Sequence, residues 1–407
     1  MKIILFDSTR REDFLPLTYL RPMAALRMGV LTIAEKWNLA TTLPVSFVTP
    51  FYLQKKYELI LDEDNLLIDG GMLPDPTMVE TVLSLQKNEV LFFNDQPLAF
   101  RLDKMETEKF IIGLPKIDTL KYTPTSISSS ASSSLVLTKL SDIFTHNNLE
   151  ITNDFKLLVG NRKSQPIPAS NTVIGDTSNI FIEEGAVVEG AFLNSTQGVI
   201  YIGKGAEVME GAVIRGSIAI CDHAIVKPGC RLLKACTIGP YCKVDGEVNN
   251  TVFQGYSNKA HDGYIGNAVV GEWCNVGAGS NFSNMQNNYH SVKQWHYPSK
   301  DFRDTGLQFC GVVLGDHTKC GISSMFNSGA VTGICCNLFG TGFHPGFIPS
   351  FSYGKKNGEY EINKLEKVLE MENIACQRRD VELSQIDQEI LAYVFSHITS
   401  INNSKID

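Results

Sequence analysis

Residues 202–244 read IGKGAEVMEGAVIRGSIAICDHAIVKPGCRLLKACTIGPYCKV, and every sixth residue of this stretch is aliphatic. These positions are Ile202, Val208, Ile214, Ile220, Val226, Leu232, Ile238 and Val244. A period of six fits neither an α-helix, which repeats every 3.6 residues, nor a single β-strand, which alternates every two. It therefore indicates a larger repeating unit, the hexapeptide coil of a parallel β-helix.

The same period returns later in the chain, and small residues accompany it at a fixed offset. A second series at this spacing runs through Leu314, Cys320, Phe326, Thr332 and Leu338, and a shorter one through Val270, Val276 and Phe282. Small side chains stand four residues after many of these positions: Ala206, Ala212, Ala224, Cys230, Cys236, Cys242, Cys274, Ala330 and Cys336. We expect both sets to point inward and to stack on their equivalents in the neighbouring coils.

The composition excludes several classes of protein. The chain has 407 residues, enough for two domains, and 36 basic against 44 acidic residues give a net charge of −8. A nucleic-acid-binding protein usually has the opposite balance. The N-terminal apolar run is too short for a signal peptide, and no apolar stretch approaches a membrane span. We therefore expect a cytoplasmic protein with no nucleic-acid or membrane partner. Its ten cysteines form no CxxC pair, and we expect them to be reduced, buried side chains.

Residues 1–165 have the pattern of an α/β domain. Buried strands are predicted at 2–6, 45–48 and 89–93, with helical patterns between them at 24–37 and 77–86. Strands alternating with helices indicate a mostly parallel sheet of the Rossmann type, whose ligands bind at the carboxyl ends of the strands. The β-helix should occupy 166–350, and 351–407 should form a C-terminal segment of one or two amphipathic helices that pack on the last coil or on another subunit.

The loop after the first predicted strand contains three arginines, Arg10, Arg11 and Arg21. Their planar guanidinium groups could hold the phosphates of a nucleotide. A solvated loop with surface arginines is the alternative. Further on, 126–134 is a serine-rich insertion that we expect to be a surface loop.

The six-residue pattern is interrupted at 249–264 and at 283–312, and both breaks are rich in Asn, His, Lys and Tyr. A β-helix is rigid, so its chemistry is expected in such loops or in grooves between neighbouring rods. Side chains of these types suit a polar small molecule.

Residues 173–344 resemble the left-handed β-helix acyltransferases. The segment HDGYIGNAVVGEWCNVGAGSNFSN, residues 261–284, is similar to the acetyltransferase half of the bifunctional family that makes UDP-N-acetylglucosamine. That family joins glucosamine-1-phosphate N-acetyltransferase to N-acetylglucosamine-1-phosphate uridylyltransferase, and the order of the two halves matches this chain.

The resemblance implies a role for individual residues of the β-helix. His261 corresponds to the catalytic base, with Asn284 near the thioester and Glu247 as an acidic neighbour. The backbone N–H of Ala278 corresponds to the group that holds the acetyl carbonyl. The remaining positions are sugar-phosphate contacts at Tyr264, Asn275, Lys293 and Asn249, and acetyl-CoA contacts at Met285 and Gly340. Asn249 stands where the family has a lysine and Met285 where it has a tyrosine.

The N-terminal half resembles the nucleotidyltransferases through the Thr9-Arg10 pair and the segment LPLTYLRP, residues 15–22, which is similar to a diverged bacterial branch of the same family. Such enzymes use a divalent ion to neutralise the reacting phosphates. The candidate ligands for Mg²⁺ are Asp69, Asp75, Asp95 and Asp154.

These observations predict a transferase of amino-sugar activation. The β-helix would move acetyl from acetyl-CoA to glucosamine-1-phosphate, and the α/β domain would couple the product to UTP with Mg²⁺. The resemblance also implies a homotrimer with sites between rods. Two alternatives are a sugar-1-phosphate nucleotidyltransferase with a purely structural β-helix, and a scaffold without catalytic activity that binds a sugar nucleotide.

Overall fold

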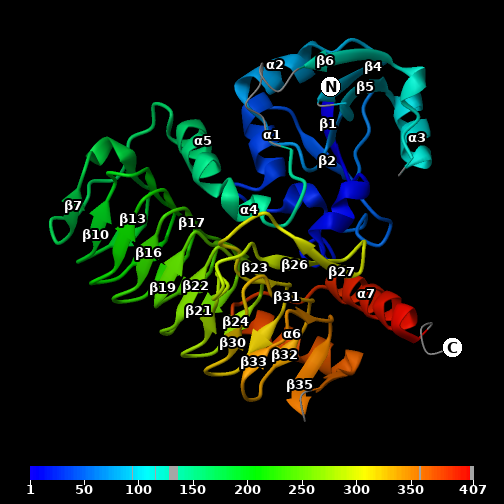
Figure 1. Cartoon of the computed structure of the whole chain (residues 1–407). Helices are drawn as coiled ribbons and strands as arrows, with labels where there is room; N and C mark the ends of the chain where they lie inside the picture. The colour runs from blue at the N-terminus through cyan, green and yellow to red at the C-terminus, as the bar shows by residue number, and fades with distance from the viewer. Residues whose placement is uncertain (94, 115, 128–135, 357–358, 404–407) are drawn as a thin grey trace. The chain divides into compact units, whose positions relative to one another are not determined.

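The computed structural model describes residues 1–93, 95–114, 116–127, 136–356 and 359–403 (Figure 1). Most of the serine-rich insertion, from residue 128 to 134, lies outside the described residues. The chain divides into two compact units, Met1–Leu26 with Leu31–Lys139, and Arg27–Val30 with Leu140–Asp407. None of the helices in the described chain is both long and apolar enough to cross a membrane.

The first unit is an α/β domain built on a six-stranded sheet with the order β2-β1-β3-β5-β4-β6. Its strands are β1 Lys2–Phe6, β2 Val45–Val48, β3 Asp64–Asp69, β4 Glu89–Phe93, β5 Gln96–Asp103 and β6 Thr123–Ile127. All of them run parallel except β5, which is antiparallel to both neighbours. The three predicted strands and the mostly parallel sheet are therefore confirmed, while β3, β5 and β6 are additional.

The helices of the first unit are α1 Ile33–Thr41, α2 Pro76–Ser84 and α3 Lys104–Gly113, with 3-10 turns η1 Thr9–Phe14, η2 Met23–Ala25 and η3 Thr119–Lys121. The helix expected from residue 24 begins only at Ile33. Thr32 caps it, accepting from the N–H of Glu35, whose carboxylate in turn accepts from the N–H of Thr32. Gly29 has φ 77°, a left-handed conformation that an α-helix does not contain, so the predicted helix cannot run through this residue.

The second unit is a left-handed parallel β-helix whose coils pass through three faces in turn. The first face contains β7 Thr172–Ile174, β10 Phe192–Asn194, β13 Val213–Arg215, β16 Arg231–Leu233, β19 Glu247–Asn249 and β22 Tyr264–Gly266, followed by a short sheet of β25 Asn281–Phe282, β30 Met325–Phe326 and β33 Phe343–His344. The second face contains β8 Ile180–Ile182, β11 Ile200–Ile202, β14 Ile218–Ile220, β17 Cys236–Ile238, β20 Val252–Gly255, β23 Val269–Glu272, β28 Val313–Leu314, β31 Val331–Thr332 and β34 Phe347–Ile348. The third face contains β9 Val187–Val188, β12 Glu207–Val208, β15 Ile225–Val226, β18 Lys243–Val244, β21 Asn258–Lys259, β24 Asn275–Val276, β29 Lys319–Cys320, β32 Asn337–Leu338, β35 Ser352–Lys356 and β36 Glu359–Ile362.

The six-residue series forms the core of the β-helix, as predicted. Each of the eight aliphatic residues from Ile202 to Val244 is buried, and so are the small residues four positions later. All ten cysteines are free and buried. Burial raises the pKa of several of their thiols, for example that of Cys236 to about 12, which keeps them protonated and apolar.

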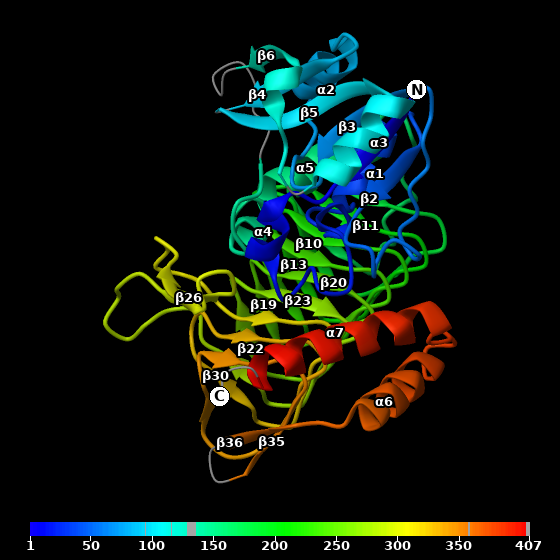
Figure 2. The ribbon, with the colours of Figure 1, turned by 90° about the vertical axis from the view of Figure 1, so that its right-hand side faces the viewer.

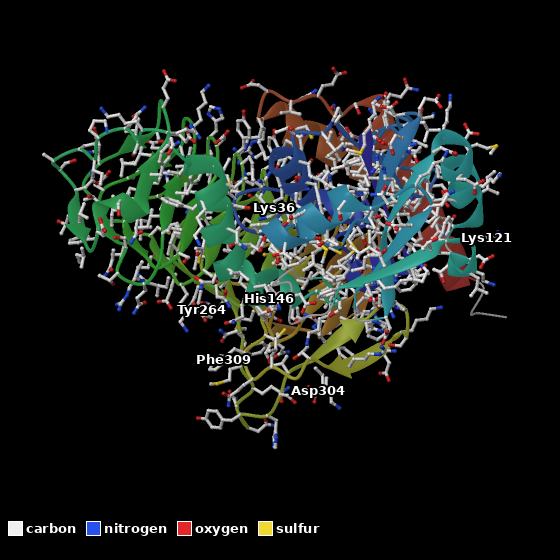
Figure 3. All side chains as sticks on the ribbon, turned by 90° about the horizontal axis from the view of Figure 1, so that it is seen from above. Lys36, Lys121, His146, Tyr264, Asp304 and Phe309 are labelled. Carbon is white, nitrogen blue, oxygen red and sulfur yellow. The ribbon has the colours of Figure 1, made fainter. Side chains whose placement is uncertain are left out.

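The remaining elements of the second unit lie outside the coils. They are α4 Asp142–Thr145, α5 Asn147–Val159, η4 Thr177–Asn179, the antiparallel hairpin β26 Lys293–His296 and β27 Asp301–Asp304, and the helices α6 Leu365–Gln377 and α7 Gln385–Asn403. Figure 2 shows α6 and α7 as two consecutive helices beside the coils. Asp304 and Phe309 lie on the segment that leaves the coils at the hairpin (Figure 3).

Candidate active site on the β-helix

His261 lies at the corner between the third and the first face, in the turn between β21 and β22. The six-residue period is broken here, so the chain leaves the regular coil and the histidine is exposed. The N–H of Gly279, from the coil above, donates to the carbonyl of Asp262 over 3.0 Å and holds this turn in place. A rigid frame thus presents an imidazole to solvent, in reach of a bound molecule.

A cleft of about 780 Å³ runs along the third face from this corner to α6. It is lined by three of the predicted site residues, His261, Asn275 and Ala278. The other residues of its wall used below are Lys243, Tyr256, Asn258, Trp273, Arg378 and Arg379. The residues predicted as the base, as a sugar contact and as an acetyl contact therefore line the same cleft.

The amide N–H of Ala278 is available inside this cleft. Its carbonyl accepts from the N–H of Ser323 over 2.7 Å, whereas its own N–H has no acceptor among the residues that the structure describes. An unpaired backbone N–H in a partly enclosed site can bind the oxygen of a polarised carbonyl.

A second group of predicted residues lies on the first face, on the other side of the corner. The hydroxyl of Tyr264 accepts from Nδ2 of Asn284 over 2.8 Å, and the same amide group donates to Oδ1 of Asn267. Glu247 is the cross-strand neighbour of Tyr264. Burial, followed by the charge of Glu247, raises the pKa of the Tyr264 phenol, so this hydroxyl remains a neutral donor.

Of the other predicted residues of the β-helix, Asn249 lies on the strand of Glu247 and Met285 directly follows Asn284, whereas Lys293 and Gly340 lie on other segments. Asn249 is opposite Gly266 on the first face, and Met285 forms an isolated antiparallel bridge with Phe309. Lys293 is exposed at the start of the β26–β27 hairpin. Gly340 is exposed next to Phe339, which lines the cleft.

The sequence reasoning missed the cations of the cleft, among them Lys243, Arg378 and Arg379. Burial lowers the pKa of Lys243, and the charges of Arg379 and Arg378 add to that effect. Arg379 donates to Oδ1 of Asn258 over 2.7 Å and to the carbonyl of Tyr241 over 3.0 Å. The two adjacent arginines at the end of α6 could have indicated an anion-binding site. Their position opposite Lys243, however, is known only from the folded structure. Cations that repel one another in this way favour an anionic ligand.

Aromatic rings stack along the edge of the coils beside this cleft. His223, Tyr241, Tyr256 and Trp273 stand at equivalent corners of successive coils, with ring centroids 4.9, 4.9 and 4.3 Å apart. All four have positive φ values, from 53° to 59°. The stack makes this wall of the cleft flat and rigid.

In the first unit, two carboxylates stand at the carboxyl ends of adjacent strands. Asp7 follows β1 and Asp69 ends β3. Arg10 forms an ion pair with Asp69 at 2.6 Å, and Nε of Arg11 lies 3.2 Å from Asp7. Asp7 was missed as a candidate, although it directly follows a predicted strand.

The three arginines predicted to hold a nucleotide have partners within the first unit. Besides Asp7, Arg11 contacts the carbonyl of Thr18 and donates to the hydroxyl of Tyr52 over 2.8 Å. Arg21 is buried and donates to the carbonyl of Leu17 over 3.2 Å. Their role toward a nucleotide stays a prediction.

The four carboxylates predicted to hold Mg²⁺ do not come together. Asp69 also accepts from the N–H of Gly71, Asp75 caps α2, and Asp95 is exposed in a turn with φ 60°. Asp154 belongs to the second unit, where it accepts from the N–H of Val30 over 2.7 Å. No group of three metal-ligating side chains gathers anywhere in the described chain. As they stand, these residues do not form a site that fits the ion.

Comparison with known proteins finds one matching family model and several similar proteins. Residues 3–163 match the model of the family described as "Sugar nucleotidyl transferase". A "Bifunctional protein GlmU" from Nocardia farcinica is 30% identical over 137 residues, which are 33% of this chain and 23% of the relative. The proteins of the same name from Rippkaea orientalis and Legionella pneumophila are 27% and 22% identical, over 44% and 49% of this chain and 42% and 49% of their own lengths. The chain thus spans less than half the length of each of these relatives.

Proposed function

Because this chain is a divergent relative of the bifunctional GlmU proteins and begins with a sugar nucleotidyl transferase domain, we propose that its β-helix is an N-acetyltransferase. The reaction is transfer of acetyl from acetyl-CoA to the amine of an amino-sugar phosphate, with glucosamine-1-phosphate as the expected acceptor. The observation that carries the proposal is that His261, Asn275 and the free N–H of Ala278 line one cleft.

The chemistry assigns a task to His261 and to the N–H of Ala278. The sugar amine attacks the thioester carbonyl, and His261 takes the proton that the nitrogen loses as the C–N bond forms. The N–H of Ala278 donates to the carbonyl oxygen, where negative charge develops. The C–S bond then breaks, and the thiolate of coenzyme A leaves with the proton that the imidazole returns.

The acyl donor fits the part of the cleft between the third face and α6. Acetyl-CoA carries several phosphates at the end opposite the thioester, and Lys243, Arg378 and Arg379 supply positive charge at the end of the cleft formed by α6. The exposed Gly340, beside Phe339, lies on the same wall. Met285 is a further proposed contact from the interrupted loop.

The sugar phosphate is assigned to the first-face group of Tyr264, Asn284 and Glu247, with Asn249 and Lys293 near its phosphate. This group and the cleft lie on two sides of one corner, so a single rod leaves the site open on one side. A homotrimer, in which a neighbouring rod covers that side, would complete it. A cytoplasmic location, where acetyl-CoA and UTP are available, belongs to the same proposal.

Uridylyl transfer from UTP by the first unit is the second proposed activity, favoured by the match of residues 3–163 to the sugar nucleotidyl transferases. Mg²⁺ would shield the phosphates during such a reaction. Because Asp69, Asp75, Asp95 and Asp154 do not form a site that fits the ion, no step of the reaction is assigned through it. Incubation with UTP, Mg²⁺ and N-acetylglucosamine-1-phosphate tests this activity, and absence of pyrophosphate release would exclude it.

Substitution His261→Ala tests the acetyltransferase. Mass spectrometry of reactions with acetyl-CoA and a panel of amino-sugar phosphates should show product with the unmodified protein and at least about 100-fold less with the variant, the usual cost of losing a general base. His290→Ala, which removes another exposed histidine outside the cleft, is the control. Undiminished acetylation by His261→Ala would exclude this histidine as the base.

A further inference from the structure

Lys259 occupies a position in the core where the other coils have apolar residues. Its strand β21 pairs with β18, and the register places it opposite Val244. The inward residues of the third face from β9 to β32 are Val188, Val208, Val226, Val244, Lys259, Val276, Cys320 and Leu338. Only 1% of Lys259 is exposed. A charged side chain in such a place needs compensation by hydrogen bonds.

Three backbone carbonyls supply that compensation. Nζ of Lys259 donates to the carbonyl oxygens of Asp245, His261 and Gly263 over 3.1, 3.0 and 3.1 Å. An ammonium group has three N–H donors, so all of them are used. Burial lowers the pKa of Lys259, while nearby Asp245 and Asp262 oppose that shift. A valine at this position would leave the carbonyls of Asp245 and His261 without this donor.

These carbonyls belong to the two segments that meet at the corner of the proposed site. His261 and Gly263 are in the turn between β21 and β22, and Asp245 is in the turn of the preceding coil, just before Glu247. The carbonyl of Gly263 also accepts from the N–H of Glu247 over 3.0 Å. Lys259 therefore joins the turn that presents His261 to the strand that carries Glu247.

The turn needs such a tether because it departs from the regular coil. Gly263 has φ 121°, a conformation that L side chains rarely adopt, and an added Cβ would lie 2.1 Å from the carbonyl oxygen of Ser280. Among the described residues, the turn is also held by backbone bonds from Gly279 and Glu247, and the N–H of Tyr264, which follows the turn, donates to Oδ1 of Asn281.

We propose that Lys259 is a positioning residue, which fixes the backbone of His261 relative to Glu247 and Tyr264 and so sets the geometry between the two halves of the site. The proposal rests on the proposed function for its effect on catalysis. Lys259 itself is buried and touches no substrate. Its part is to keep the imidazole, by way of the main chain, within reach of an amine bound on the first face.

Substitution Lys259→Met, which keeps the length of the side chain and removes its donors, tests the proposal in the full-length protein. Activity per folded molecule should fall about 10- to 100-fold in kcat, because small displacements of a catalytic group have effects of this order. The KM for acetyl-CoA should change less than about twofold, since Lys243, Arg378 and Arg379 are untouched. Val226→Ala, at the same position two coils earlier, lowers core packing without reaching the turn and should leave kcat unchanged.

Hydrogen exchange gives a readout that does not depend on activity. In Lys259→Met the amides that donate the hydrogen bonds at the turn, those of Glu247, Tyr264 and Gly279, should exchange at least about tenfold faster, while those of the coils around Val226 keep their protection. If Lys259→Met is folded and neither kcat nor exchange in the turn changes, Lys259 is only a core residue and the proposal is overturned. If the unmodified protein acetylates no amino-sugar phosphate, the proposed function fails, and the exchange experiment still decides whether Lys259 positions the turn.

Discussion

Nδ1 of His317 lies 2.7 Å from a carboxylate oxygen of Glu372, 55 residues further along the chain. The same carboxylate accepts from Nζ of Lys319 at 2.6 and 2.7 Å, and none of the Glu372 side chain is exposed. Burial alone would raise the pKa of Glu372, but the charges of His317 and Lys319 hold it below its usual value. This buried ionic group attaches α6 to the third face and thereby forms one wall of the cleft.

Substitution Glu372→Gln should loosen α6. It removes the carboxylate that pairs with the ammonium of Lys319 and with the ring of His317, and losing one partner of a buried ion pair costs about 3 kcal/mol or more. Since the pKa of Glu372 is lowered in the folded protein, this stabilisation is complete above its ordinary value of 4.5 and is lost as the pH falls below it. Limited proteolysis at pH 7 should cut the variant near α6 first. Glu370→Gln, an exposed change on the same helix, is the control, and equal resistance of both variants would contradict the prediction.

The attachment of α6 could not be predicted from the sequence. Helical spacing predicted an amphipathic helix in this region but left open whether it packs on its own coil or on another subunit. The answer depends on Glu372 meeting His317 and Lys319, which no local pattern connects. The coils were predictable because each inward residue repeats every six positions and contacts its own equivalents.

The candidate site, too, could be predicted from the sequence only in part. The break in the repeat at 249–264 marked the corner, and the resemblance supplied His261, Asn275 and Ala278, which share the cleft. Lys259 lay inside this break and drew no attention as a core residue, because only the pairing of β21 with β18 reveals that it replaces a valine. Where an irregular loop interrupts the repeat, the residue numbers alone do not give the register between the strands of successive coils.

The charge of Arg378 should matter for binding of the acyl donor. Arg378→Glu reverses a charge in the cleft and should raise the KM for acetyl-CoA by about tenfold while kcat changes little, because it removes attraction that does not depend on the transition state. The increase should shrink as ionic strength rises. Lys367→Glu, an exposed reversal on α6 outside the cleft, has the same effect on net charge and should leave the KM unchanged. Equal effects of both variants would mean that only net charge acts.

The hydroxyl of Tyr264 should act on the sugar side of the site. Tyr264→Phe removes the acceptor that Asn284 uses at 2.8 Å, so the amide of Asn284 can turn away from the first face. A lost hydrogen bond of about 1 to 1.5 kcal/mol corresponds to roughly a tenfold higher KM for the amino-sugar phosphate, with the KM for acetyl-CoA unchanged. Steady-state kinetics with each substrate varied in turn measures both. Tyr289→Phe, at a ring 67% exposed on the loop, is the matched control, and an effect confined to acetyl-CoA would refute the assignment.

Asp7 should make the stability of the first unit depend on pH. Burial raises the pKa of its carboxyl to about 6, against the opposing charge of Arg11. A carboxyl with a raised pKa in the folded state contributes stability that is complete below its ordinary value of 3.8 and is lost as the pH rises through about 6. A shift of this size corresponds to roughly 3 kcal/mol.

Asp7→Asn isolates this contribution, because the amide has no carboxyl to titrate: its oxygen can still accept from the N–H of Met23, while its NH2 group can donate to the hydroxyl oxygen of Thr49. Thermal unfolding of both proteins between pH 4 and 7 should show a midpoint difference that changes with pH. The unmodified protein should lose stability relative to Asp7→Asn as the pH rises from 4 to 7. Curves that remain parallel over this range would mean that Asp7 is ionised throughout, with the charge of Arg11 outweighing the cost of burial.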